Sequence, residues 1–130
     1  MEESDVFLDL LRRLNSPSPQ VRASAAKSLG DFGNPKAISY LMKLFDDPDI
    51  FVLESVIEAL GNLEAIEAVP KIIHNLKTSP DYGIRKVAAE ALIKIGTDEA
   101  FEAVKEQYEQ ETNEQFKKYL RNLLKSKKLI

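Results

Sequence analysis

The stretch QVRASAAKSLGDFGNPKAI, residues 20–38, contains most of one helix, the signals that end it and the start of the next helix. Gly33 fits the left-handed backbone position that often closes a helix. Asn34 and Pro35 then supply a cap followed by proline at the first helical position. The stretch GIRKVAAEALIKIGTDEAF, residues 83–101, has a glycine stop and a threonine cap in the equivalent places. Together the two stretches indicate a helical repeat.

The repeat extends over the whole chain with a period of 31 or 32 residues. One anchor position recurs four times, at Val21, Val52, Ile84 and Phe116. A leucine follows each anchor by eight residues, at Leu29, Leu60, Leu92 and Leu124. A residue suited to helix capping precedes each anchor by three, at Ser18, Asp49, Asp81 and Asn113. So many matches at one period predict four copies of one structural unit.

Each unit is predicted to be a first helix, a tight turn and a second helix. The first helices carry apolar residues at the i, i+3, i+4, i+7 spacing of one buried face, for example Ile38, Leu41, Met42 and Phe45. No stretch alternates with period two, so no sheet is expected. Two-helix units bury their apolar stripes by stacking. We therefore predict an all-α fold, an α-solenoid of four two-helix repeats over residues 4–33, 34–64, 65–96 and 97–130 in a single domain, 1–130. The first helix of the last copy is the most polar, with Lys105 and Gln107 at apolar positions, as suits a terminal repeat.

The segments 20–38 and 83–101 resemble the short HEAT repeats of the phycobilisome-lyase type. The resemblance implies an α-α superhelix, and it implies that Arg22 and Arg85 join neighbouring repeats along the turns between helices. Proteins with such repeats include scaffolds, chromophore lyase subunits, a metal-dependent hydroxylase and a DNA glycosylase. A lyase-like or hydroxylase-like accessory role is therefore one functional expectation.

Composition limits the kinds of partner. The formal net charge is −3, which does not favour general binding to nucleic acid or to acidic membranes. The chain has no cysteine, and no apolar run approaches the roughly 18 residues of a membrane span. We expect a soluble, cytoplasmic protein that does not bind membranes.

Motifs for catalysis are sparse. The hydroxylase relatives use paired His-Glu motifs, whereas this chain has one histidine, His74, followed by Asn75. One histidine does not make a multi-histidine metal site, and the glycines form no phosphate-binding loop. The sequence therefore predicts no metal, no cofactor and no enzymatic activity.

The second copy departs most from the repeat pattern. Leu53 replaces the basic residue of the other copies, and Phe51 and Ile50 add apolar residues to a helix whose core face is already supplied. Stacking is expected to bring Tyr82 close to them. An exposed apolar and aromatic patch on a protein surface commonly marks a protein contact. The alternatives are that these residues fold inward as a local cluster or that a homodimer covers them.

The concave face is expected to be lined by the second helices. Its residues are predicted to be Ala23, Lys27, Glu54, Glu58, Lys86, Glu90, Lys118 and Asn122. We predict a non-catalytic scaffold that binds another protein through this face and through Ile50, Phe51, Leu53, Glu54, Glu58 and Tyr82. The chain itself is expected to be a monomer or a weak homodimer.

The end of the chain is basic. Its cationic residues are Lys117, Lys118, Arg121, Lys125, Lys127 and Lys128, and the helix before it is strongly acidic. One interpretation is that the two helices neutralise each other and that the lysines favour the helix dipole. The other is that this end binds an anionic partner, including nucleic acid weakly.

Overall fold

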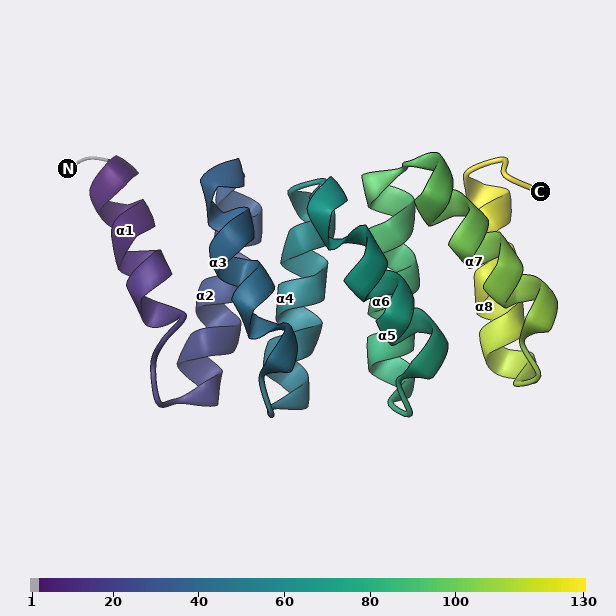
Figure 1. Cartoon of the computed structure of the whole chain (residues 1–130), viewed down its shortest axis with the longest axis horizontal. Helices are drawn as coiled ribbons and strands as arrows, with labels where there is room; N and C mark the ends of the chain where they lie inside the picture. The colour runs from purple at the N-terminus through teal and green to yellow at the C-terminus, as the bar shows by residue number, and fades with distance from the viewer. Residues whose placement is uncertain (1–2) are drawn as a thin grey trace.

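A computed structural model of the chain describes residues 3–130, and it is helical throughout. Within that range lie eight α-helices and no strand: α1 (Glu3–Arg13), α2 (Pro19–Phe32), α3 (Ile38–Met42), α4 (Ile50–Asn62), α5 (Val69–Thr78), α6 (Tyr82–Ile95), α7 (Asp98–Gln110) and α8 (Glu114–Ser126). Three short 3-10 helices accompany them: η1 (Pro35–Ala37), η2 (Lys43–Asp46) and η3 (Ile66–Ala68). The helices follow one another along the long axis in two layers, with α1 and α8 at opposite ends (Figure 1). The all-α solenoid predicted from the repeat is confirmed.

Side-chain caps start the second helix of every repeat. Ser18, Asp49, Asp81 and Asn113 each accept a hydrogen bond from a backbone N–H two or three residues further on. Each such cap stabilises its helix by about 1 kcal/mol. Gly33 and Gly96 close α2 and α6 with left-handed φ angles of 83° and 74°, which a residue with a Cβ adopts only at a cost. The predicted starts and stops of these helices are confirmed.

The first helix of the second repeat is not the single helix that its apolar spacing predicted. It is divided into η1, α3 and η2, so only five residues are α-helical. Asp47 follows with an extended backbone, because the ring of Pro48 excludes helical geometry from the residue before it. The preceding turn tightens to 3-10 geometry, which is common at helix ends.

The second helices pack closely along the stack. A Cβ added to Gly30 would lie 2.8 Å from Ala59 Cα, and one added to Gly61 would lie 2.9 Å from Ala91 Cα. Glycine therefore lets α2 approach α4, and α4 approach α6, at backbone distance. Between the first three repeats, the second helices lie closer together than the first helices, whereas α5 and α7 approach more closely than α6 and α8. The first three repeats therefore curve with α2, α4 and α6 on the inner side.

Buried ion pairs join two of the three repeat boundaries. Arg22 on α2 donates to both carboxylate oxygens of Asp47, at 2.9 and 3.2 Å, and to the Ser16 carbonyl at 2.8 Å. Arg85 on α6 donates to Glu111 and to the Leu76 carbonyl. Between the second and third repeats, the equivalent positions are Leu53 and Ser79, which carry no charge.

These ion pairs hold two carboxyl groups in the charged form. Burial raises the pKa of Asp47, but the Arg22 hydrogen bonds, the Asp49 N–H and the charge of Arg22 together outweigh burial and hold that pKa below its usual value. Burial likewise raises the pKa of Glu111, and hydrogen bonds from Arg85, Gln107 and the Asn113 N–H outweigh it and lower the pKa. Gln107, expected on a polar capping helix, is thus buried and part of this network.

No helix in the described part of the chain is long and apolar enough to cross a membrane.

Candidate protein-binding surface

Among the described residues, Phe51 is the most exposed large apolar side chain, with 70% of its surface accessible, and it stands in the first turn of α4. It lines a hollow of about 300 Å³ together with Pro19, Gln20, Ala23 and the helix cap Asp49. We call this the Phe51 hollow. It lies between α2 and α4 on the inner side of the stack. Ile50 next to it is 42% exposed, so neither residue folds into a local core cluster.

The other predicted apolar residues are placed differently. Leu53 is half-buried and packs against the hydrophobic core, at the repeat position that Arg22 and Arg85 hold in other copies. Tyr82 is 43% exposed, and its ring packs edge-on against Phe116 with the ring centres 5.5 Å apart. Tyr82 therefore contacts the fourth repeat, and it does not line the Phe51 hollow.

A second hollow lies beside the first, between α4 and α6. Its volume is about 270 Å³, and we call it the carboxylate hollow: Glu54, Ser55, Glu58, Gly83, Lys86, Val87 and Glu90 line it. Among the residues that the structure describes, no lysine or arginine lies within ion-pair distance of its three carboxylates. The hollow thus combines three acidic groups with one ammonium group.

Two tyrosines flank that ammonium group. Lys86 Nζ lies 4.8 Å from the centre of the Tyr119 ring and 5.8 Å from the centre of the Tyr82 ring. The Tyr119 hydroxyl donates a hydrogen bond to Glu90. Burial raises the pKa of Tyr119 far above its ordinary value, and the bond to Glu90 raises it further, so this hydroxyl remains a donor. Cations bind favourably over aromatic faces.

The structure therefore divides the predicted site into two adjacent hollows on one helix. Phe51 belongs to the first, Glu54 and Glu58 to the second, and Tyr82 to the rim beyond it. Tyr119 was missed, because its position in the repeat is occupied by small or aliphatic residues in the other copies. Only the stacking of α8 on α6 reveals that it reaches Glu90.

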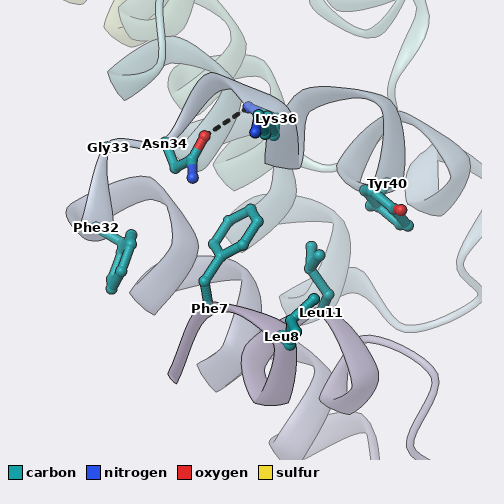
Figure 2. Close-up of a pocket in the computed structure, with 8 residues that line it drawn as sticks. All are labelled: Phe7, Leu8, Leu11, Phe32, Gly33, Asn34, Lys36 and Tyr40. Carbon is teal, nitrogen blue, oxygen red and sulfur yellow. Dashed lines mark hydrogen bonds between the residues drawn. The ribbon is translucent and has the colours of Figure 1, made fainter. Parts of the chain in front are cut away.

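A larger hollow than these two was also missed. It has a volume of about 570 Å³ and lies between α1, the end of α2 and α3, as Figure 2 shows. Its lining residues are Phe7, Leu8, Leu11, Phe32, Gly33, Asn34, Lys36 and Tyr40. Leu8 and Tyr40 are exposed. The sequence signal for this hollow is that both are large apolar residues at positions outside the core-facing stripe of their helices.

Comparison with known proteins agrees with the repeat architecture: residues 4–92 match the family of HEAT repeats. The chain belongs to the HEAT-repeat family. It is 33% identical over 73 residues to phycocyanobilin lyase subunit alpha of Synechococcus elongatus, a match that covers 56% of this chain and 27% of that protein. The resemblance to repeats of the phycobilisome-lyase type is thus confirmed.

Enzymes are also among the relatives of this HEAT-repeat chain. It is 32% identical to deoxyhypusine hydroxylase of Bos taurus and 31% identical to that of Homo sapiens, each over 88 residues that cover 67% of this chain and 29% of the relative. The chain spans less than a third of the length of the relatives it matches. The prediction that it is not an enzyme is wrong, because these hydroxylase relatives are enzymes. Sparse catalytic motifs within one repeat segment say little about the activity of such proteins.

The paired His-Glu motifs that the resemblance implies have no counterpart in the chain. His74 is exposed on α5, and its neighbour is Asn75. Within residues 3–130, no group of three or more histidine, cysteine, aspartate or glutamate side chains is arranged to hold a metal ion. These residues do not fit a histidine-carboxylate metal centre.

The basic end lies on α8 and the residues after it. Lys117 Nζ lies 5.2 Å from the centre of the Tyr108 ring, and Lys118, Lys125, Lys127 and Lys128 are exposed. Two acidic side chains of α7 pair with residues outside α8: Glu106 with Lys77 on α5, and Glu102 with Lys105 on α7 itself. One interpretation was that α7 and α8 neutralise each other. Glu102 and Glu106 do not do so, because neither pairs with a basic residue of α8.

Proposed function

We propose that this HEAT-repeat chain binds an extended protein segment on the inner face formed by α2, α4 and α6. The observation that carries the proposal is the 70% exposure of Phe51 beside the carboxylate hollow. A large aromatic side chain held on a rigid helix is the type of residue that dominates protein interfaces.

The geometry of α4 supports this surface. Phe51, Glu54 and Glu58 are spaced i, i+3 and i+7, so they lie along one face of the helix. That helix is held on both sides by the close approaches at Gly30 and Gly61. A surface preorganised in this way loses little conformational entropy when it binds.

The proposal concerns recognition, and the bound segment is either a partner or a substrate. A hydroxylase-like or lyase-like role is the second candidate, and the names of the relatives support it. We also propose a cytoplasmic location and a monomeric or weakly dimeric state. Binding of an anionic partner by the basic end is a separate, weaker proposal. It concerns Lys117, Lys118, Arg121, Lys125, Lys127 and Lys128. None of these six side chains forms an ion pair with a described residue, and none lines one of the hollows above.

Selection from a displayed library of random peptides tests the proposal, followed by binding measurements on the selected peptides. Phe51→Asp should abolish binding of most peptides selected on the unaltered chain. Ile66→Asp is the matched control, because Ile66 is 63% exposed but lies in η3, beyond the end of α4 opposite to Phe51, and lines neither hollow. Circular dichroism shows whether both variants keep their helicity. The proposal fails if no peptide is enriched, or if Phe51→Asp and Ile66→Asp bind the selected peptides alike. Sedimentation of the unaltered chain at rising concentration shows whether a second copy covers Phe51 instead.

A further inference from the structure

We propose that the carboxylate hollow accepts a lysine or arginine side chain of the bound segment, while an apolar residue of that segment enters the Phe51 hollow. This inference rests on the proposed function and specifies the chemistry of the partner. It identifies the partner as a segment in which a large apolar residue and a basic residue lie close together.

The negative charge of the carboxylate hollow favours a basic residue in the bound segment. Glu54, Glu58 and Glu90 line one hollow, and no cation of the described residues is paired with them at ion-pair distance. Lys86 supplies one positive charge against three negative charges. Gly83 lets the Glu54 carboxylate lie against α6, since a Cβ there would be only 3.0 Å from Glu54 Oε2. No side chain at position 83 therefore separates an incoming guanidinium or ammonium group from this carboxylate.

The tyrosines supply a second, independent preference for a cation. Tyr82 and Tyr119 already hold the ammonium group of Lys86 over their rings. Tyr119 is fixed in this position by its hydrogen bond to Glu90 and by stacking on Phe116. The hollow thus carries its own cationic occupant on a flexible stem. Lys86 competes with a cation of the partner, and its removal should strengthen binding.

The spacing along α4 defines the segment. At about 1.5 Å of rise per residue, Glu54 and Glu58 lie about 4.5 and 10.5 Å along the helix axis from Phe51. An extended chain advances about 3.3 Å per residue. An apolar residue in the Phe51 hollow therefore places a basic residue two or three positions away beside these carboxylates. A free polyamine or a metal ion would use the carboxylates but would leave the Phe51 hollow empty.

Four fluorescein-labelled synthetic peptides provide the test. The first carries a leucine and an arginine two positions apart in a glycine-serine background. In the second the arginine is replaced by glutamine, in the third the leucine is replaced by alanine, and in the fourth both are replaced. Fluorescence polarisation measures their binding at low and at physiological salt. The leucine-arginine peptide should bind best. Because exposed charge pairs each contribute about 0.2–1 kcal/mol, Glu54→Gln/Glu58→Gln should weaken its binding by about twofold to thirtyfold, and salt should weaken it too. Lys86→Met should tighten it.

The control Glu99→Gln/Glu109→Gln changes the net charge equally on α7, where both residues are exposed away from α4. It should leave the affinity nearly unchanged. Equal weakening by the two double variants would mean that only the overall charge acts, and it would overturn the inference. Equal binding of the arginine and glutamine peptides, with sensitivity to Phe51→Asp alone, would also overturn it but would leave the proposed function standing. The inference would likewise be overturned, and the proposed function would stand, if none of the four peptides binds while library peptides without basic residues bind in a Phe51-dependent way. The proposed function itself fails by different outcomes: no library peptide is enriched, or Phe51→Asp leaves binding unchanged.

Discussion

The close approach of α4 and α6 at Gly61 gives the sharpest test of how this stack is held together. A Cβ placed on Gly61 would lie 2.9 Å from both Ala91 Cα and Ala91 Cβ, whereas ordinary contacts are 3.4–4 Å. The obstacle includes backbone, so no side-chain rotation relieves it. The Gly61→Ala variant must move the two helices apart by roughly half an ångström, and overpacking of this kind costs about 1–3 kcal/mol.

Helix propensity acts in the opposite direction. Alanine is favoured over glycine inside a helix by at most about 1 kcal/mol. We therefore expect Gly61→Ala to lower the free energy of unfolding by about 1–2 kcal/mol, and the midpoint of thermal unfolding by about 3–5 °C for each kcal/mol in a chain of this size. Thermal and urea unfolding followed by circular dichroism would measure both.

Gly83→Ala is the matched control. The new Cβ there meets only the ends of the Glu54 and Asp81 side chains, at 3.0 and 3.2 Å, and Glu54 is free to shift. Its stability should stay within about 0.5 kcal/mol of the unaltered chain, since propensity and crowding nearly cancel. In a double-mutant cycle, Ala91→Gly should cost less in the Gly61→Ala background than alone. Equal or greater stability of Gly61→Ala relative to Gly83→Ala would refute the argument that glycine sets the helix spacing.

Three further predictions concern the ends and boundaries of the repeats. Arg22→Leu should cost about 2–3 kcal/mol in urea unfolding because it leaves Asp47 buried without its partner, and Arg22→Leu/Asp47→Ser should cost clearly less. The pKa values of Asp47 and Glu111 are lowered in the folded state, so the stability they contribute is complete above the usual carboxyl range of about 4 and is lost as pH falls through their lower folded values. Urea unfolding between neutral and acidic pH should show this loss, and Asp47→Asn should make it shallower. Asp81→Ala should lower the thermal midpoint through a loss of about 1 kcal/mol, because α6 loses its N-terminal cap.

The fold follows from the sequence because its signals are local and repeated. A cap such as Asp81, a stop such as Gly96 and a 3.6-residue apolar stripe each depend on a few neighbouring residues. Four copies in one register make a chance agreement improbable. The exception is the divided first helix of the second repeat. Pro48 alone does not explain it, because α5 stands undivided before the equivalent Pro80.

The surface could be predicted only in part, since it depends on contacts between repeats. Glu54 and Glu58 were identifiable because the repeat register places them on the second helices. The separation of Phe51 from Tyr82 was not, because Tyr82 turns towards Phe116, which lies 34 positions further along the chain. Tyr119 was missed for the same reason. The hollow at Phe7 and Tyr40 depends on how far α1 stands from α3, which no spacing within a single repeat determines.

The departures in the second repeat form one coherent change. Leu53 and Ser79 together replace the ion pair that Arg22–Asp47 and Arg85–Glu111 form at the other boundaries, so no buried charge is left without a partner. The close contact at Gly61 keeps α4 and α6 at their spacing without that ion pair. A basic residue at position 53 would stand next to Glu54 and would oppose the negative charge of the carboxylate hollow. Its replacement by leucine therefore strengthens the attraction for a cation on the proposed surface, while the packing of small residues, which carries no charge, maintains the stack.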